Sequence, residues 1–223
     1  MCGRFTRKEN FALLAKALGL DSFLQLDPSY NVAPSQMVAC LRTRPETHQV
    51  EYIPLQWGLV PGWAKDPKIG YRMINARAET VAEKPSFRKA FARQRCLVLA
   101  DGFYEWKREG KSKQPYYIHF RDNRPFAFAG LWERWDKGGE TPLESCALIT
   151  TGPNELMKPI HDRMPVILDP QHYPLWLDSD EHDRAALLPL LQPFSEEDME
   201  AYPVSTLVNN PRSNSPQCVE PLP

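Results

Sequence analysis

The sequence has no pair of cysteines at CxxC spacing, and five cysteines are spread along the chain: Cys2, Cys40, Cys96, Cys146 and Cys218. An odd number of distant cysteines argues against both a disulfide framework and a zinc site. No apolar run reaches the roughly 18 residues of a membrane-spanning helix, and the N-terminal segment lacks the apolar core of a signal peptide. We therefore expect a reduced, cytoplasmic, soluble protein.

Glycine is also scarce, with 11 residues against 22 prolines. Because proline interrupts helices and stiffens turns, this composition predicts many short elements rather than a bundle of long helices. The length of 223 residues, with 42% apolar and 25% charged residues, indicates one globular domain.

The net charge of −1 gives no overall positive field that would attract nucleic acid. The charges are nevertheless segregated. Residues 84–113 carry nine basic against three acidic residues, and residues 169–200 carry nine acidic residues against one arginine. Either the basic segment binds a polyanion, or both segments are ordinary solvent-facing surfaces.

Residue patterns predict an α+β fold with a mixed, barrel-like β core flanked by short helices. Thr6 and Glu9 have capping-box spacing, and apolar residues at helical intervals follow, which predicts a helix over 11–18. Strands are expected at 37–42, 50–57, 96–100, 116–120, 126–132, 146–151, 165–168 and 201–205, with a charged hairpin loop at 107–114. Helical sequence is expected up to residue 93, interrupted at Pro85, and at 154–160, 171–177 and 182–191. We assign residues 2–210 to one domain and 211–223 to a loose, proline-rich tail.

The start of the chain carries the first candidate for chemistry. Removal of Met1, which a small second residue permits, would leave Cys2 with an α-amine and a thiol on one residue. Reference pKa values of about 8 and about 8.5 make both nucleophiles accessible near neutral pH. Such a 1,2-aminothiol can capture an aldehyde first as an imine and then as a five-membered thiazolidine. A cysteine at position 2 can also occur by chance.

Four later residues have a structural interpretation, and Trp63, Glu105 and His161 also have a functional one. Trp63, in a loop broken by glycine and proline, either covers the core or stacks a nucleobase. Asn75 stands where a helix N-cap belongs. Glu105 is either a solvent-facing strand residue or a partly buried acid–base group whose pKa is raised by burial. His161 either caps a short helix or transfers protons.

Six short blocks occur in one order: Cys2–Phe5 (CGRF), Tyr30–Pro34 (YNVAP), Trp57–Trp63 (WGLVPGW), Asn75–Thr80 (NARAET), Asp101–Trp106 (DGFYEW) and His161–Pro165 (HDRMP). In this order and spacing the chain resembles the SRAP family (SOS-response-associated peptidase domain), whose members shield abasic sites in single-stranded DNA. The resemblance extends from Cys2 to about Asn209.

The resemblance implies a covalent reaction with DNA. The Cys2 amine would attack the open-chain aldehyde of an abasic deoxyribose, and the Cys2 thiol would then close a thiazolidine that blocks strand cleavage. Glu105 would act as the general acid–base. His161 would protonate the sugar ring oxygen or assist reversal, and Asn75 would hold a sugar hydroxyl or the oxygen on the reacting carbon.

The resemblance also implies how DNA is bound. Arg4, Arg77 and Arg163 would contact phosphate oxygens, Trp63 would stack a neighbouring base, and Asn31 would brace the Cys2 end. Some relatives have a second tryptophan after the one matching Trp63, whereas Ala64-Lys65-Asp66 follows here.

Further expectations come with the family. Its peptidase label implies self-removal of Met1, a hydrolase activity, with removal by an aminopeptidase as the open alternative. An imine intermediate implies weak lyase activity by β-elimination. The expected partner is single-stranded DNA containing abasic sites. We expect a cytoplasmic monomer, associated with the bacterial nucleoid during DNA damage, with no metal and no organic cofactor.

Two other functions stay open. Class II glutamine amidotransferases also begin Met-Cys-Gly, so Cys2 could instead attack an amide, and release of ammonia from glutamine would identify that activity. A non-catalytic single-stranded-DNA-binding module would use the basic segment alone, and it would bind DNA without forming a covalent product.

Overall fold

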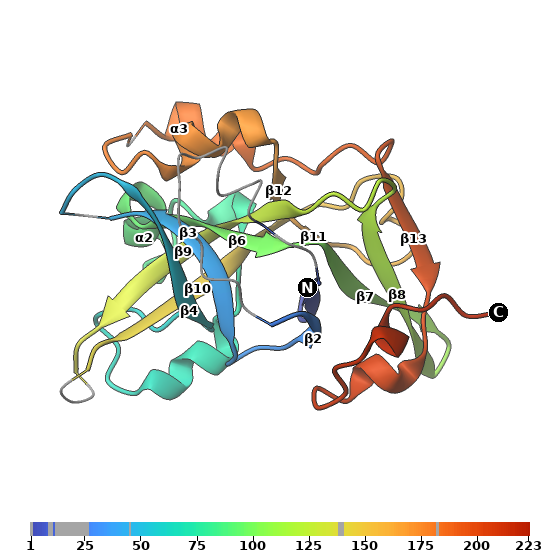
Figure 1. Cartoon of the computed structure of the whole chain (residues 1–223). Coiled ribbons are helices and arrows are strands. Elements are labelled where there is room, and N and C mark those ends of the chain that lie inside the picture. The colour runs from blue at the N-terminus through green and yellow to red at the C-terminus, as the bar shows by residue number, and fades with distance from the viewer. Residues whose placement is uncertain (1, 9–10, 12–26, 45, 138–140, 182) are drawn as a thin grey trace.

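Five strands close into a barrel in the computed structural model, which describes residues 2–8, 11, 27–44, 46–137, 141–181 and 183–223 (Figure 1). The ring runs through β3 (Met37–Thr43), β4 (Val50–Trp57), β10 (Leu143–Thr151), β9 (Phe126–Trp135) and β6 (Arg95–Ala100), which returns to β3. The β4–β10 pairing is parallel and the other four are antiparallel, so the barrel is mixed.

Three short strands extend the ring along β9 and β10. β5 (Asn75–Arg77) continues the parallel pairing with β10 beyond the end of β4. β11 (Met164–Pro165) pairs with the last residues of β10, and β12 (Ile167–Leu168) pairs with β9. The segment around Asn75 and the segment just before β11 are therefore both attached to the second half of β10.

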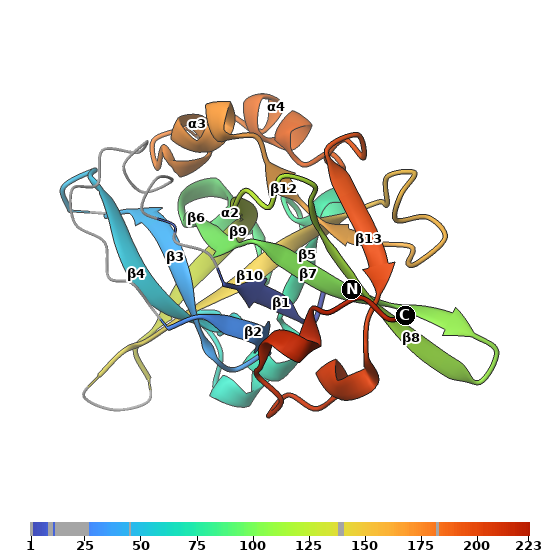
Figure 2. The same cartoon turned by 45° about the vertical axis from the view of Figure 1, so that its right-hand side comes forward.

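A second, antiparallel sheet packs beside the barrel. Its strands, in spatial order, are β13 (Met199–Pro203), β8 (Ser112–Phe120), β7 (Gly102–Glu109), β1 (Phe5–Arg7) and β2 (Ser29–Val32). Only Asp101 separates β6 from β7, so the chain passes directly from the barrel into this sheet. Figure 2 shows β1 between the barrel strands and the β7–β8 hairpin.

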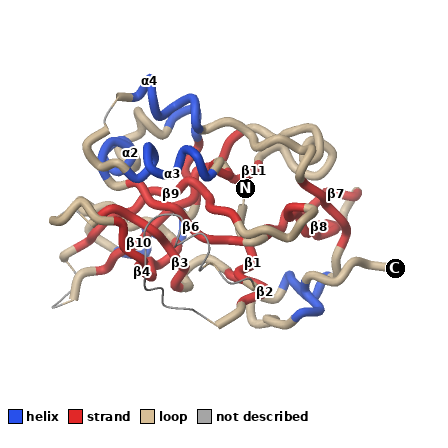
Figure 3. The backbone as a smooth tube through the Cα atoms, turned by 45° about the horizontal axis from the view of Figure 1, so that its top comes forward, coloured by secondary structure: helices blue, strands red, loops and turns tan. Residues whose placement is uncertain are grey.

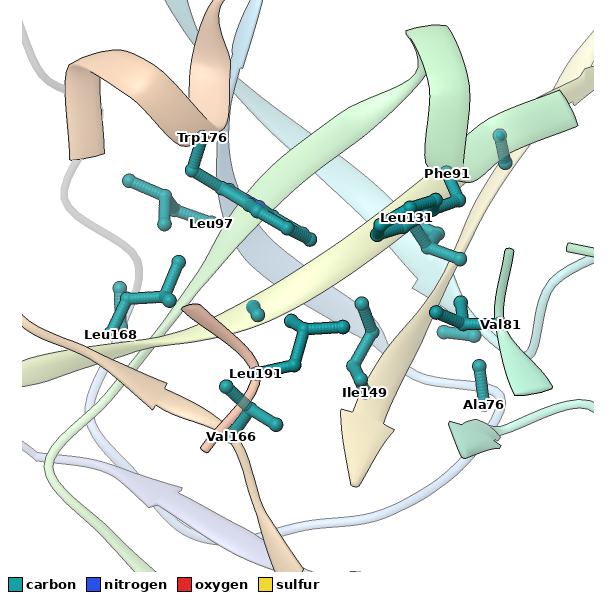
Figure 4. Close-up of a cluster of buried hydrophobic side chains, with 14 of the residues drawn as sticks. Ala76, Val81, Phe91, Leu97, Leu131, Ile149, Val166, Leu168, Trp176 and Leu191 are labelled. Atoms are coloured by element: carbon teal, nitrogen blue, oxygen red, sulfur yellow. The ribbon is translucent and has the colours of Figure 1, made fainter. Parts of the chain in front are cut away.

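Side chains at alternate positions of the barrel strands pack into two separate buried clusters. In one cluster, residues such as Leu97 and Leu131 pack under α2 (Arg88–Arg93) and α3 (Tyr173–Leu177). Figure 4 shows Trp176 of α3 beside Leu97. Complete burial of each large apolar side chain contributes about 1.5–3 kcal/mol.

The other cluster joins the two sheets. Phe128 of β9 packs against Phe5 of β1 with ring centroids 5.7 Å apart and against Phe103 of β7 at 6.2 Å. Cys2 and Trp57 belong to the same cluster. The start of the described chain is therefore built into the core, and all five cysteines of the protein are free and buried.

The helices are short, and α2, α3 and α4 (Arg184–Leu187) lie together on one side of the strands (Figure 3). The remaining elements are 3-10 turns: η1 (Pro67–Arg72), η2 (Ala78–Thr80), η3 (Pro170–His172), η4 (Leu188–Leu190), η5 (Thr206–Asn209) and η6 (Pro216–Cys218). No helix in the described part of the chain is both long and apolar enough to cross a membrane.

The predicted fold class is confirmed: the chain forms one α+β domain with a mixed β barrel and short flanking helices. The strand predicted at 50–57 has those bounds, and the predicted helix at 11–18 lies, except for residue 11, outside the described residues. The hairpin loop predicted at 107–114 is wrong, because β7 and β8 continue to a turn at Gly110–Lys111, where Gly110 has a φ of 63°.

The predicted helices are shorter than expected. The segment leading to residue 93 is α-helical only over Arg88–Arg93, after a 3-10 turn at Ala78–Thr80, and the predicted interruption at Pro85 is present. Residues 155–160 form consecutive turns in place of the helix predicted over 154–160. Asn154 Oδ1 accepts the Met157 N–H, and Pro159 removes a further donor.

The prediction of a loose tail is also wrong. Cys218 is fully buried, and Pro221 forms a β-bridge with Val204. The Tyr202 hydroxyl donates to the carbonyl oxygen of Val219 at 2.9 Å. The many prolines predicted irregular backbone, and the segment is irregular. Composition alone does not predict the buried contacts that hold it in place. A domain boundary at residues 210–211 stays a prediction.

Candidate active site

Cys2 lies at the junction of the two sheets, with no exposed surface. Phe5, three residues later, pairs with Val32 of β2 and with Phe103 of β7, which anchors the segment by backbone hydrogen bonds on both sides. The Asn75 side-chain amide donates to the Cys2 carbonyl oxygen at 2.7 Å. The backbone of Cys2 is therefore held in place, although terminal residues often fray.

Asn75 occupies the first position of β5, opposite Leu148 of β10. The helix N-cap interpretation is therefore wrong, because a β-ladder and not a helix holds this residue. Its Nδ2 is used by Cys2, while its Oδ1 is buried and has no hydrogen-bond partner among the described residues. A buried acceptor of this kind is suited to a donor that arrives with a ligand.

Glu105 and His161 approach each other from different parts of the chain. Glu105 lies on β7 and is 2% exposed, and His161 lies just before β11. Glu105 Oε2 and His161 Nε2 are 3.7 Å apart. Burial raises the pKa of Glu105 to about 7. The interpretation of Glu105 as a solvent-facing strand residue is wrong.

The surroundings of His161 favour a neutral ring with its proton on the side of Glu105. Nδ1 accepts the backbone N–H of Arg163 at 3.0 Å, which leaves Nε2 to carry the proton of the neutral ring. Burial lowers the pKa of His161, and the exposed Asp162 carboxylate, 3.0 Å from Nδ1, offsets this effect only in part.

The Cys2 thiol is affected by its burial and by the charge of Glu105. Burial raises the pKa of the Cys2 thiol well above its ordinary value, and the charge of Glu105 raises it further. The thiol is therefore protonated near neutral pH, and it needs a base to become nucleophilic. Within the described ranges, no cluster of histidine, cysteine and carboxylate side chains has the geometry of a metal site.

A groove of about 800 Å³ opens beside the Glu105–His161 pair. It is lined by both of these residues, by Trp106, Lys107 and Arg108 of β7, by Lys113 of β8, and by 158–160 and Asp162. The buried acid–base pair thus borders a surface depression that an extended ligand can enter.

The chain as a whole is similar to known proteins. A family model described as SOS response associated peptidase (SRAP) matches residues 1–211. The chain belongs to the SRAP family.

Relatives of this SRAP chain carry names that refer to DNA damage. It is 50% identical to the abasic site processing protein YoqW of Bacillus subtilis over 99% of both chains. It is 36% identical to the abasic site processing protein HMCES of Xenopus tropicalis, over 86% of this chain and 65% of that one. A crystal structure of a protein from Bacteroides thetaiotaomicron matches with a TM-score of 0.86 at 31% identity, covering 99% of this chain and 100% of that chain.

Arg4, which is expected to contact phosphate in this SRAP chain, and Asn31, which is expected to brace the Cys2 end, both bind other parts of the protein. Arg4 Nη1 donates to Asn31 Oδ1 at 3.0 Å and to the Val208 carbonyl oxygen at 2.7 Å. Asn31 is 1% exposed, and its Nδ2 donates to the carbonyl oxygens of Val208, Asn210 and Ser213. Asn31 thus has the contacts of a brace between β2 and the C-terminal segment, and Arg4 shares that role.

Of the other residues expected to contact DNA, Trp63 and Arg77 are accessible to solvent, whereas Arg163 is paired with a carboxylate. Trp63 is 56% exposed in the loop between β4 and β5, and Arg77 is exposed at the end of β5. Arg163 Nη1 and Nη2 contact the two carboxylate oxygens of Glu79 at 2.6 and 3.0 Å. Sequence reasoning missed Glu79 as a partner, although it belongs to the NARAET block that also contains Asn75 and Arg77.

Proposed function

We propose that this SRAP protein processes abasic sites in DNA by capturing the sugar aldehyde on Cys2 after removal of Met1. The observation that supports the proposal is the convergence of Cys2, Asn75, Glu105 and His161, which come from distant parts of the chain, beside an open groove. Relatives named abasic site processing proteins match nearly the whole chain.

The first stage forms an imine. Hydrolysis of the Met1–Cys2 peptide bond frees the α-amine, whose nitrogen attacks C1 of the open-chain aldehyde. Proton transfer gives a carbinolamine, and loss of its protonated hydroxyl as water gives the imine. Glu105, with a pKa of about 7, can take a proton from the amine and return one to the departing hydroxyl at neutral pH.

The second stage closes the ring. Cys2 Sγ adds to the imine carbon, its proton passes to a base, and the imine nitrogen gains a proton, so that a neutral thiazolidine results. Because the buried thiol is protonated, this stage needs a carboxylate close by, and Glu105 is that group. Nε2 of His161 lies on the Glu105 side and can relay protons to the sugar oxygen.

Asn75 would align the reactants during both stages. Its Nδ2 fixes the carbonyl of Cys2, and its buried Oδ1 can accept a hydrogen bond from a sugar hydroxyl. Trp63, Arg77 and Arg163 would contact the flanking nucleotides, with Arg4 and Asn31 supporting the start of the chain.

The proposal includes several finer expectations. They are a preference for single-stranded DNA, removal of Met1 by the protein itself, weak β-elimination at the imine, a cytoplasmic location with nucleoid association during DNA damage, and a monomeric state. Membership of the SRAP family argues against the glutaminase alternative.

The test is a crosslinking assay with a single-stranded oligonucleotide that carries one abasic site. The wild type is expected to give a band of reduced mobility after heating in SDS, and Cys2→Ala is expected to give none. Cys2→Ser is the matched control: it keeps the amine, so borohydride should trap its imine, but it cannot form the heat-stable ring. DNA binding by the wild type without any covalent product would instead favour a non-catalytic binding module.

A further inference from the structure

Four cationic side chains line the groove beside the Glu105–His161 pair, against one acidic residue besides Glu105, Asp162. Lys107 and Arg108 of β7 and Lys113 of β8 line it from the hairpin side, and Lys158 lines it from the turn that precedes His161. Two of these cations have an acidic neighbour, since Lys107 lies 3.9 Å from Glu109 and Lys158 contacts Glu155. Such exposed ion pairs contribute little, so a stronger anion can replace them.

Arg108 and Lys113 form a pair of opposed cations on the hairpin. They are directly opposite each other in the β7–β8 ladder, so their side chains leave the same face of the hairpin. Both are exposed, and neither has an ion-pair partner among the residues that the structure describes. Like charges in such a pair are destabilising. A bound anion would remove this cost.

The cationic wall is continuous with the site. Arg108 follows Glu105 by three positions on β7, about 10 Å of extended backbone. This odd spacing starts the two side chains on opposite faces of the strand, yet both residues line the same groove near the end of the hairpin. Arg108 is also close enough to His161 that its charge adds to burial in lowering the pKa of that ring. An anionic chain attached to a sugar at Glu105 would therefore pass next to the opposed pair.

We propose that this groove binds the phosphate backbone of the DNA strand on one side of the reacting sugar, with Arg108 and Lys113 as its principal contacts. The inference rests on the proposed function for the identity of the polyanion. It adds a binding surface on the β7–β8 hairpin to Trp63, Arg77 and Arg163, which belong to other elements.

The test uses the double variant Arg108→Gln/Lys113→Gln and a matched control, Arg88→Gln/Lys89→Gln. The control also removes one exposed arginine and one exposed lysine from the same basic sequence segment, but from α2, outside the groove. Binding of fluorescein-labelled single-stranded DNA without an abasic site is measured by anisotropy over a range of salt concentrations, and crosslinking to abasic DNA is measured in parallel.

Loss of both contacts is expected to raise Kd and to reduce the slope of log Kobs against log salt concentration by about 1.4, since each single-strand phosphate contact contributes about 0.7. The control is expected to keep the wild-type slope. The charge-preserving variant Arg108→Lys/Lys113→Arg should also keep it, which separates lost charge from damage to the hairpin.

The two proposals fail in different ways. If the wild type crosslinks abasic DNA but the groove variant keeps the wild-type salt slope, the groove proposal is overturned and the proposed function stands. If the wild type does not crosslink, the proposed function fails. The groove remains a DNA-binding site if the salt dependence of DNA binding is reduced in the groove variant but not in the α2 control. Equal losses in the groove variant and the α2 control overturn the groove proposal.

Discussion

Glu105 Oε2 lies 3.7 Å from His161 Nε2, and burial raises the pKa of the glutamate but lowers that of the histidine. The carboxyl has a pKa of about 7, and the pKa of the imidazole is lower than usual. Near neutral pH, Glu105 is therefore able to exchange protons with a reactant. In the proposed capture of an aldehyde by Cys2, this pair would supply the acid–base groups.

Replacement of Glu105 by glutamine is expected to change the pH profile of crosslinking. In the wild type, the rate should rise through pH about 7 as Glu105 becomes a carboxylate, and again near pH 8 as the α-amine loses its proton. Glu105→Gln should slow the reaction about 10²-fold at pH 7 and leave only the step near pH 8. Single-turnover rates between pH 5.5 and 9 test this, and a retained step near pH 7 would remove Glu105 from the mechanism.

The same substitution is expected to alter stability as a function of pH. The pKa of Glu105 is 4.5 in the reference state and about 7 in the fold, so the folded protein binds the extra proton between these values. The free energy of unfolding of the wild type therefore falls, relative to that of Glu105→Gln, as the pH rises from about 4.5 to 7. The cumulative difference is at most about 3 kcal/mol. Urea unfolding of both proteins at pH 4.5 and pH 8 measures it, and parallel pH dependences would contradict the shifted pKa.

Asn75 is expected to act as a positioning residue through its bond to the Cys2 carbonyl. Asn75→Asp removes the donor and keeps an acceptor, whereas Asn75→Ala removes both. If fixing Cys2 is the main contribution, both variants should crosslink at least about tenfold more slowly, because a misplaced nucleophile reacts poorly. Binding of DNA without an abasic site should not change. Loss of that binding in parallel with the rate would instead assign Asn75 to DNA contact.

Much of this architecture could be predicted from the sequence. Alternating and continuous apolar runs indicated most barrel strands, and the ordered blocks led to the family and to Cys2, Asn75, Glu105 and His161. The distance between Glu105 and His161 could not be derived from either local pattern. It depends on two pairings between strands that are distant in sequence. β11, which follows His161, pairs with β10, and β7, which contains Glu105, pairs with β1.

The charge pattern was informative only in part. Residues 84–113 read as one basic segment, but the fold divides it between α2, the barrel and the β7–β8 hairpin. Arg95 even lies buried, where it donates to backbone carbonyls such as those of Phe91 and Trp176. Spacing along the sequence does not reveal which cations share a surface, and it likewise gave no sign that Glu79 meets Arg163.

Glu79 is expected to compete with DNA for Arg163. Its carboxylate accepts from both Nη atoms in the geometry that a phosphate would use, while the Thr150 carbonyl holds Nη2 independently. Because Glu79 is 53% exposed, the pair contributes less than about 1 kcal/mol. Glu79→Gln should therefore tighten single-stranded DNA binding by up to about fivefold at low salt. Weaker binding in an anisotropy titration would show that Glu79 instead orients Arg163.

Asn31 is expected to contribute to stability and not to DNA affinity. Asn31→Ala removes an amide that donates to the carbonyl oxygens of Val208, Asn210 and Ser213 and that accepts from Arg4. These carbonyl groups would be left with fewer partners, so the free energy of unfolding should fall by about 1–3 kcal/mol. Urea unfolding measures this loss, and Ser29→Ala, which removes an exposed hydroxyl bonded to Asn214, is the matched control on the same strand.

Because Asn31 is buried, the salt dependence of DNA binding should stay at its wild-type value in the variant. Unchanged stability combined with weaker binding would mean that Asn31 contacts DNA directly, which its burial under the C-terminal segment opposes.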